Sequence, residues 1–258
     1  KDRMTIFQSL ILGIVEGVTE FLPISSTGHL ILASKALGLD ASNFAKSFEI
    51  IIQLGAIGAV IALYWQSFLR LENLKKLLVA FIPTGVIGLA LYKLVKTYLL
   101  GNTSVVLWAL ALGGLALILF ERWHKESETA ASDLSQITYR QAFWIGLAQA
   151  VAIIPGVSRA AATIVGGLIL GLKRQTIVEF SFLLAVPTML AASGLDLIKN
   201  ADTFSRDQFL SLTIGFVTAF LVALVTIKFL LQFIKTHNFT SFGVYRILIA
   251  LILWFFIF

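Results

Sequence analysis

Long apolar runs separated by short polar connections make up nearly the whole chain, and ten apolar segments can be distinguished. Six of them are long, and a helix needs about 20 apolar residues to cross the hydrocarbon of a bilayer. A helix is the expected conformation because lipid offers no partner for backbone N–H and C=O groups. The six predicted transmembrane helices lie near Ser47–Trp65, Leu77–Val95, Val105–Phe120, Ile177–Ile198, Phe209–Phe233 and Phe242–Phe258.

The other four apolar segments are too short to cross a bilayer, and they occur in two pairs. Each pair is interrupted by a proline, which lacks the N–H that a continuous helix needs. Such a break is tolerated within a membrane only where protein or water covers the non-helical backbone, so each pair predicts a re-entrant helical hairpin. The pairs are Ile6–Leu22 with Ser25–Leu37, around Pro23, and Ala142–Ile154 with Ser158–Leu170, around Pro155.

One long hydrophilic loop, Glu121–Arg140, divides the chain into two similar halves, residues 1–120 and 141–258. GIVEGVTEFLPISSTGH from Gly13 parallels GLAQAVAIIPGVSRAAAT from Gly146. Matched positions are Glu16 with Gln149, Pro23 with Pro155 after a one-residue shift, and Glu49 with Glu179. Each half reads as one hairpin plus three transmembrane helices, and because three is odd the second half enters from the opposite face. The prediction is a single all-α polytopic membrane domain, an inverted-topology repeat whose hairpins meet near the midplane.

The composition excludes a soluble protein, since 58% of the 258 residues are hydrophobic, 13% are charged and the mean hydropathy is +0.92. A soluble domain of this size has a largely polar exterior. Without cysteine there is neither a disulfide nor a thiolate metal site. The net charge of +6 fits contact with anionic head groups, so a bilayer and no nucleic acid is expected as partner. The first apolar segment carries Glu16 and Glu20 and is not expected to be a cleaved signal.

Lysine and arginine are enriched on the cytoplasmic side of membrane proteins. If the first hairpin opens to one side, eight of these residues fall on that side and ten on the other, together with Glu121–Arg140. The predicted orientation therefore puts Glu121–Arg140 in the cytoplasm. Both termini, including Asp2, and the opening of the site are predicted on the outer, periplasmic side.

The residues that carry chemistry gather in the first hairpin, in EGVTEFLPISSTGH from Glu16 to His29. Ionisable groups in a hydrophobic setting are costly and indicate a functional site. Glu16 and Glu20 are four residues apart, so they share one helical face. Neighbouring carboxylates in a dry site either share a proton or bind a cation, and oxygen ligands suit Mg²⁺ or Ca²⁺. The alternative is that both carboxylates line a water-filled vestibule.

Ser25, Ser26 and Thr27 follow Pro23, where a new helix is expected to begin. Serine and threonine cap helix N-termini, and the free N–H groups there form an anion site, so Ser25 and Thr27 are predicted to bind substrate. His29 lies within one helical turn of both serines. A serine beside a histidine and a glutamate is the arrangement of an activated nucleophile, which predicts Ser26 in that role. The alternative is that the serines only cap the helix while His29 bonds a backbone carbonyl.

The second hairpin contributes PGVSRAAAT, from Pro155 to Thr163, in which Arg159 is the only charge. The donors of a guanidinium match phosphate oxygens, and the helix that starts there adds its own N–H groups. Ser158 and Thr163 are the hydroxyls of this stretch that are predicted to contact the same substrate. The alternative is that Arg159 extends to the membrane interface and anchors a helix.

With these motifs in this order, the chain resembles the bacitracin-resistance type of undecaprenyl-diphosphate phosphatase over nearly its whole length. The resemblance implies an inner-membrane enzyme that hydrolyses a C55 isoprenyl diphosphate to the monophosphate and inorganic phosphate, recycling the lipid carrier of cell-wall synthesis. By position, the family's E-x-x-x-E pair is Glu16 and Glu20, its P-x-S-S-T-G-H motif is Pro23–His29, and its P-G-x-S-R arginine is Arg159. Ala160 stands where the family usually has a second serine.

One hypothesis joins these residues. Arg159 and the two helix starts hold the diphosphate, and a divalent cation bridges the diphosphate to Glu16 and Glu20. Ser26 attacks the terminal phosphorus and His29 manages its proton; the rival chemistry uses an activated water as nucleophile. The prenyl tail is expected in an apolar groove between helices. This hypothesis predicts that Ser26 and Arg159 lie close together in the fold.

A different class of function stays open, because inverted repeats with broken helices also build secondary transporters and could build a lipid flippase. In that case Arg159 would bind an anion, and Glu16, Glu20 and His29 would carry protons. The Ser-Ser-Thr-Gly-His cluster favours an enzyme, since it exceeds what binding needs. The sequence leaves open the prenyl chain length, the preferred cation and the oligomeric state, a homodimer included.

Overall fold

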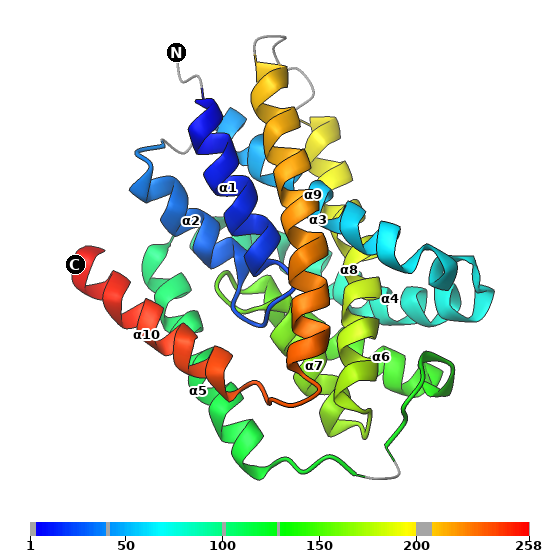
Figure 1. Cartoon of the computed structure of the whole chain (residues 1–258). Helices are drawn as coiled ribbons and strands as arrows, with labels where there is room; N and C mark the ends of the chain where they lie inside the picture. Colours follow the sequence, from blue (N-terminus) through cyan, green and yellow to red (C-terminus); the bar gives the residue numbers. More distant parts are fainter. Residues whose placement is uncertain (1–3, 40–41, 100–101, 128–129, 200–207, 258) are drawn as a thin grey trace.

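The computed structural model describes residues 4–39, 42–99, 102–127, 130–199 and 208–257, and this part of the chain is almost entirely helical (Figure 1). Its α-helices are α1 (Ile6–Thr19), α2 (Ser26–Ala36), α3 (Asn43–Leu69), α4 (Leu71–Leu94), α5 (Thr103–Trp123), α6 (Tyr139–Gln149), α7 (Arg159–Ile169), α8 (Arg174–Lys199), α9 (Phe209–Phe233) and α10 (Thr240–Ile257). A π-helical turn (η1, Val95–Leu99) and two 3₁₀ turns (η2, Leu134–Gln136; η3, Ala150–Ile153) complete the elements.

Five of the described helices are long and apolar enough to cross a membrane: α3, α4, α5, α8 and α9. The prediction of an all-α polytopic membrane protein is confirmed at this level. Helix α10, the sixth predicted transmembrane helix, is also apolar but is shorter than these five and is not among the candidate spans of the described residues. Phe258, the predicted end of this last segment, and Asp2, near the N-terminus, lie outside the described residues.

The four short helices α1, α2, α6 and α7 occupy the two predicted hairpin regions, and both proline breaks are present. Helix α1 ends at Thr19 and α2 begins at Ser26, with Pro23 in the connection. Helix α6 passes into the turn η3 and α7 begins at Arg159, with Pro155 in the connection. Proline weakens a helical hydrogen-bond ladder, which agrees with both breaks, although Pro83 and Pro187 lie inside the continuous helices α4 and α8.

The first helix of each hairpin begins with the same capping box. Thr5 accepts a hydrogen bond from the backbone N–H of Gln8, and the side chain of Gln8 accepts one in return from the backbone N–H of Thr5. Thr138 and Gln141 make the same reciprocal pair at the start of α6. Such a pair satisfies N–H groups that have no partner inside the helix, so both helix starts are specified locally.

Each of these capped helices packs closely against a long helix from the other half of the chain, α1 against α9 and α6 against α4 (Figure 1). Glycine permits both contacts. A Cβ on Gly13 of α1 would lie 2.8 Å from the carbonyl oxygen of Gly215, and one on Gly146 of α6 would lie 1.9 Å from that of Ala80. Small residues allow such close backbone approach, which contributes strongly to helix association in membranes.

The described structure corrects one boundary from the sequence. Glu121 was predicted at the start of the hydrophilic loop, but helix α5 continues to Trp123 and Glu121 is buried. Its carboxylate pairs with the guanidinium of Arg174, the first residue of α8, and accepts a 3.1 Å hydrogen bond from the backbone N–H of Phe239. The sequence places Glu121 in the hydrophilic loop because it begins a polar stretch, and a distant partner such as Arg174 cannot be recognised from that pattern.

Replacing Gly146 by alanine is expected to lower the thermal unfolding temperature of the purified protein in detergent. The new methyl group would collide with the backbone of Ala80, and overpacking of this kind costs about 1–3 kcal/mol or more. Gly194→Ala in α8 is the matched control, because nothing lies within 4 Å of a Cβ there. That control should be neutral or stabilising, since alanine is favoured over glycine in a helix by about 1 kcal/mol. Equal unfolding temperatures for the two variants would contradict the close packing of α4 and α6.

Candidate active site at the two hairpin breaks

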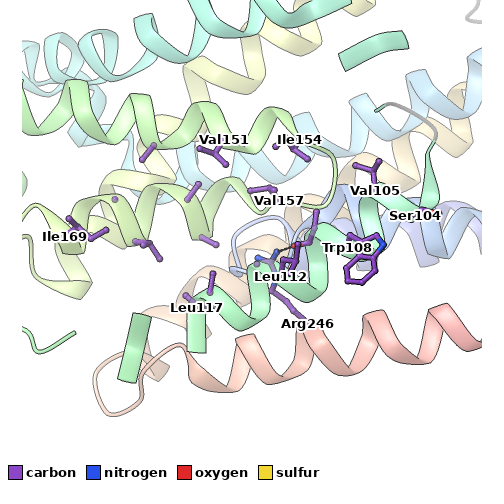
Figure 2. A pocket seen from close by; sticks show the side chains of 18 residues that line it. Ser104, Val105, Trp108, Leu112, Leu117, Val151, Ile154, Val157, Ile169 and Arg246 are labelled. Carbon is purple, nitrogen blue, oxygen red and sulfur yellow. Dashed lines mark hydrogen bonds between the residues drawn. The ribbon is translucent and has the colours of Figure 1, made fainter. Parts of the chain in front are cut away.

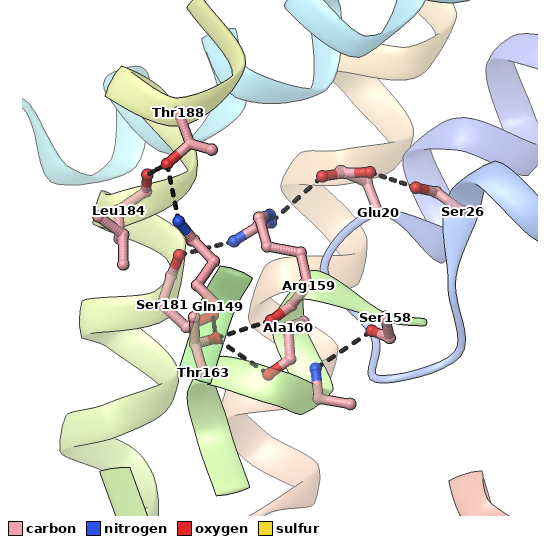
Figure 3. A network of polar contacts seen from close by, with 11 residues as sticks. Glu20, Ser26, Gln149, Ser158, Arg159, Ala160, Thr163, Ser181, Leu184 and Thr188 are labelled. Carbon is pink, nitrogen blue, oxygen red and sulfur yellow. Dashed lines mark hydrogen bonds and ion pairs between the residues drawn. The ribbon is translucent and has the colours of Figure 1, made fainter. Parts of the chain in front are cut away.

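A single buried carboxylate, that of Glu20, connects the two hairpins (Figure 3). Its Oε2 accepts a short hydrogen bond from the hydroxyl of Ser26, the first residue of α2. Its Oε1 accepts a 3.2 Å hydrogen bond from Nη2 of Arg159, which lies 139 residues later in the chain. Ser26 and Arg159 are therefore separated by no more than one carboxylate group, and the predicted proximity of these two residues is confirmed.

Arg159 is held from two sides, and part of its guanidinium remains without a partner. Nη1 donates a 2.9 Å hydrogen bond to the backbone carbonyl of Ser181 on α8, and Nη2 donates to Glu20. Its Nε is buried and makes no hydrogen bond to any described residue. Thr163 supports this arrangement through its hydroxyl, which lies 2.6 Å from that of Ser181 and donates to the carbonyl of Arg159. The second hairpin thus presents a positioned cation with one donor free.

Glu16 is fully buried, and neither of its carboxylate oxygens has a hydrogen-bond partner in the described part of the chain. Its carboxylate interacts electrostatically with the side chains of Glu20, Glu49 and Arg159. Four of the six buried side-chain polar atoms that lack a partner among the described residues belong to Glu16, Gln149 and Arg159. Unsatisfied buried polar atoms are rare and call for an explanation, so the hairpins are the place where a ligand is expected.

The carboxylate of Glu16 fits a divalent cation, whereas both oxygens of Glu20 already accept hydrogen bonds from Ser26 and Arg159. Mg²⁺ and Ca²⁺ prefer oxygen ligands, and Glu16 has two oxygens without a donor. Within the described ranges no group of three or more His, Cys, Asp or Glu side chains could hold a metal. Any such cation would therefore need further oxygens from solvent or from a phosphate ligand, as Mg²⁺ commonly does.

Backbone strain is concentrated at Ser25, next to the predicted nucleophile. Its φ of +72° is the only positive value at a non-glycine residue in the described ranges. Sparsely populated backbone conformations cost about 1–3 kcal/mol and cluster at functional sites. The Ser25 hydroxyl accepts a 3.5 Å hydrogen bond from the backbone N–H of Gly28 and so caps α2. This conformation places Ser26 at the helix start and leaves Thr27 exposed on the same turn.

His29 has partners other than the predicted one. Its Nδ1 lies 2.8 Å from the backbone carbonyl of Ser25, and its Nε2 lies 2.8 Å from the hydroxyl of Tyr245 on α10. The hydroxyl of Ser26 is instead directed to Glu20, so the predicted hydrogen bond between Ser26 and His29 is not among those of the described residues. The alternative in which His29 bonds a backbone carbonyl is the geometry observed.

The second hairpin adds a cap and a buried amide. Ser158 caps α7, where its hydroxyl accepts a 3.1 Å hydrogen bond from the backbone N–H of Ala161. Gln149, which the sequence pairs with Glu16, donates to the hydroxyl of Thr188 at 3.2 Å (Figure 3) and to that of Thr84 at 2.9 Å. These contacts tie α6 to α4 and α8 behind the site.

Three residues that contribute here were not singled out from the sequence. Ser181 offers a backbone carbonyl, for which no sequence signal exists. Tyr245 lies in an apolar run as an ordinary aromatic residue. Arg246 follows it and is only 1% exposed. The rule that drew attention to Arg159, a lone charge inside an apolar run, applies equally to Arg246 and could have identified it.

Two apolar hollows flank the hairpin breaks. The larger, of about 730 Å³, runs between α5 and the second hairpin, with Trp108, Leu112, Val157 and Arg246 among the residues that line it (Figure 2). The smaller, of about 340 Å³, lies where the end of the first hairpin meets α9 and α10 and includes Tyr245. Both hollows are bounded almost wholly by hydrocarbon side chains, as a site for a lipid chain requires.

These features define a class: a polytopic helical membrane protein with a buried hydroxyl, carboxylate and guanidinium where two broken helix pairs meet. The model of the bacitracin resistance protein BacA family matches residues 9–252, and the chain belongs to this family.

Similar proteins include one named undecaprenyl-diphosphatase from Sulfurihydrogenibium sp. (strain YO3AOP1), 50% identical over 98% of this chain and 100% of that protein. Proteins of the same name from Aquifex aeolicus (strain VF5) and Wolinella succinogenes are each 51% identical, over 96% and 98% of this chain and 97% and 99% of theirs.

Proposed function

We propose that this chain hydrolyses undecaprenyl diphosphate to undecaprenyl phosphate and inorganic phosphate. The names of its relatives, at about half identity over nearly full length, support this reaction, and so does the chemistry of the site. The alternative of a transporter is not favoured by these relatives. The chain is thus a membrane-embedded phosphatase that acts on a lipid diphosphate.

The observation that carries the proposal is that one site contains both a hydrogen-bond donor without an acceptor and carboxylate oxygens without a donor. Arg159 has a free N–H donor, which an anion would satisfy, and Glu16 has two free carboxylate oxygens, which a cation would satisfy. Glu20 lies between them and is bonded to Arg159. A diphosphate together with a divalent cation supplies both missing partners at once. An apolar ligand would leave these buried polar atoms unpaired, at a cost of about 1–3 kcal/mol each.

In the proposed reaction Ser26 is the nucleophile and Glu20 accepts its proton. The Ser26 oxygen forms a bond to the terminal phosphorus while the bond from that phosphorus to the bridging oxygen breaks, releasing undecaprenyl phosphate. Water then attacks the phosphoserine, returns the free hydroxyl and yields inorganic phosphate. His29, one turn along α2, is assigned the proton of that water, which its Nε2 accepts in place of the hydrogen bond from Tyr245. The rival route, in which water attacks the diphosphate directly, forms no phosphoserine.

The phosphate oxygens are bound by Arg159, by the N–H groups at the start of α2 and by those at the start of α7, where Ser158 caps the helix. Such helix starts favour anions through both free donors and the helix dipole. Glu16 and Glu20 would hold a divalent cation, Mg²⁺ or Ca²⁺, which neutralises charge on the diphosphate when bound. Thr163 holds Arg159 in place. The prenyl tail occupies the larger apolar hollow, between α5 and the second hairpin.

The proposed architecture is an inverted-topology repeat in which α1–α5 correspond to α6–α10. Its support is that corresponding helices make corresponding contacts. Helix α1 packs on α9 of the other half, and α6 packs on α4 in the same way. The last helices of the two halves, α5 and α10, pack on each other. Gly114 and Gly243 meet at that last contact, where a Cβ on either would lie within 2.8 Å of the other's carbonyl oxygen. The matched capping boxes of α1 and α6 have the same spacing to Gly13 and Gly146. Each hairpin is proposed to be re-entrant, because both of its helices are too short to span a bilayer.

The test of the function is phosphate release from undecaprenyl diphosphate by the purified protein in detergent, where transport across a membrane cannot occur. Release should depend on added Mg²⁺ or Ca²⁺. Trapped phosphoserine at Ser26 would support the nucleophile, whereas full turnover by Ser26→Ala would exclude it in favour of water. If no phosphate were released under these conditions, transport of an anionic substrate would become the favoured function.

Glu20→Gln is expected to reduce turnover by about 10²–10⁴-fold, the usual contribution of general acid–base catalysis. The amide keeps the size of the side chain but cannot accept the proton of Ser26, and it weakens a cation site. Turnover should recover in part at high divalent cation concentration if metal binding is the main defect. Glu72→Gln on α4, an exposed carboxylate paired with Lys75, is the control and should keep full turnover. Wild-type turnover of Glu20→Gln at low cation concentration would leave Glu20 as mere lining of a vestibule.

Arg159→Lys is expected to reduce kcat/KM by about 10- to 100-fold, because hydrogen bonds to charged groups contribute roughly 1.5–3 kcal/mol. An ammonium keeps the charge but cannot reach Glu20, the Ser181 carbonyl and a phosphate with a fixed fork of donors. Arg140→Lys, at the exposed start of the same hairpin, is the matched control. If Arg159→Lys retained full activity, the arginine would be a helix anchor at the interface.

The site is proposed to open to the periplasmic side of the inner membrane, with Glu121–Arg140 in the cytoplasm. Because the chain has no cysteine, single cysteines report their side without background. Lys35→Cys, exposed in the last turn of α2, should react with an impermeant thiol reagent in intact cells. Ser127→Cys should react only after permeabilisation. The reverse pattern would invert the orientation and leave the repeat unaffected.

A further inference from the structure

Helix α10 sends two consecutive side chains, Tyr245 and Arg246, to the two hairpins, and the proposed reaction assigns no role to either. Arg246, labelled in Figure 2, is buried. Its guanidinium donates four hydrogen bonds, all to backbone carbonyls. Nε donates to Leu110 at 3.3 Å, Nη1 to Pro23 at 3.3 Å, and Nη2 to Ala109 at 2.9 Å and to Gly156 at 3.2 Å.

The acceptors of Arg246 lie at the points that fix the geometry of the site. Pro23 is the break between Glu20 and Ser26 in the first hairpin. Gly156 is the turn three residues before Arg159 in the second, with a φ of +93° that requires glycine. The remaining two carbonyls belong to α5. One planar guanidinium therefore fastens both breaks to the same helix, and the distance between the two halves of the site depends on it.

Arginine is suited to this role because of its shape. Its donors point in fixed directions within one plane, so it can bond carbonyls from three chain segments simultaneously. A lysine ammonium is a compact charge on a flexible stem and cannot hold the same separated carbonyls in register. The broken backbone gains partners as well, which a hairpin within a membrane needs for its free carbonyls.

Tyr245 acts on the first hairpin through His29. The carbonyl of Ser25 can only accept a hydrogen bond, so Nδ1 of His29, 2.8 Å away, carries the ring proton. Nε2 then has the lone pair and accepts a hydrogen bond from the Tyr245 hydroxyl at 2.8 Å. The two rings are nearly parallel, with centroids 5.6 Å apart and an angle of 8° between their planes. Tautomer and ring orientation of His29 are thereby set by α10 and by Ser25 together.

We infer that Tyr245 and Arg246 are positioning residues of the phosphatase site: Arg246 sets the spacing of the two hairpin breaks, and Tyr245 orients His29. The inference rests on the proposed function for its kinetic effects, while the Tyr245–His29 contact is testable without activity. Arg246 contacts none of the groups assigned to the reaction, and Tyr245 contacts them only through Nε2 of His29. The last helix of the chain thus completes a site whose chemistry lies in the four short helices.

The test for Arg246 compares Arg246→Lys with Arg174→Lys, which alters the partly buried arginine that pairs with Glu121 away from the site. Both variants should lose stability, and both are assayed well below their unfolding temperatures with turnover expressed per folded molecule. We expect kcat to fall by about 100-fold only in Arg246→Lys, the loss that a misplacement of about 1 Å produces. Equal kcat values in the two variants would reduce Arg246 to a purely structural residue and overturn the inference.

The test for Tyr245 is Tyr245→Phe, which keeps the stacked ring and removes only the hydroxyl. We expect kcat to fall about tenfold at unchanged KM and unfolding temperature, less than the roughly 10²–10⁴-fold contribution of general acid–base catalysis itself. Tyr139→Phe, which removes an exposed 2.8 Å hydrogen bond to Glu72, is the matched control and should keep its kcat. An unchanged kcat in Tyr245→Phe would contradict the positioning role.

A second measurement separates this inference from the proposed reaction. In protein with ¹⁵N-labelled histidine and the background substitutions His124→Asn and His237→Asn, the two ring nitrogens of His29 are observed directly. The wild-type ring should carry its proton on Nδ1, and the Nε2 resonance should move in Tyr245→Phe because its donor is lost. A wild-type proton on Nε2, or a resonance that does not move, would overturn the role of Tyr245 even if the enzyme is active. The expected shift in a protein without phosphatase activity would instead refute only the proposed function.

Discussion

The carboxylate of Glu20 is the contact on which the arrangement of the site depends. It is buried, and a buried charge is stable only when it is paired and hydrogen-bonded. Its two partners come from different halves of the chain, Ser26 beside it and Arg159 far along the sequence. Removing Glu20 or Arg159 would leave the charge of the other without its partner, and breaking a buried ion pair in this way typically costs about 3–5 kcal/mol. The same bond that joins the halves therefore also aligns a hydroxyl, a proton acceptor and a phosphate-binding group.

Much of the fold could be predicted from the sequence because the membrane restricts the options. Backbone groups in lipid must pair within their own segment, so each apolar run becomes a helix. Two of the four prolines, Pro23 and Pro155, lie at breaks, whereas the other two lie inside α4 and α8. The helices α1, α2, α7 and α9 accordingly lie within a few residues of the predicted segments. The main error concerns Glu121. A charged residue next to a polar stretch was expected in water, but Glu121 is buried because it pairs with Arg174, which is distant in the sequence.

The site was predictable only where chemistry and sequence proximity coincide. The hydroxyls and carboxylates of the first hairpin and Arg159 are recognisable because polar groups in an apolar run need a reason. Their pairing was not, since local spacing favoured His29 as the partner of Ser26, whereas the fold directs Ser26 to Glu20 and His29 to Tyr245. Partners supplied by a helix more than 200 residues away leave no local pattern to read.

Three arginines, one buried and two partly buried, show how hydrogen-bond completeness distinguishes structure from function in this chain. Arg246 donates to four carbonyls, and Arg174 pairs with Glu121 through two nitrogens and lies over the ring of Phe239. Arg159 bonds Glu20 and one carbonyl, yet its buried Nε has no partner in the described part of the protein. A satisfied guanidinium stabilises the segments it joins, whereas an incompletely satisfied one retains binding capacity for an anion. Because Arg159 and Arg246 are both lone charges in apolar runs, it is the unpartnered Nε of Arg159, and not burial itself, that assigns the phosphate to Arg159.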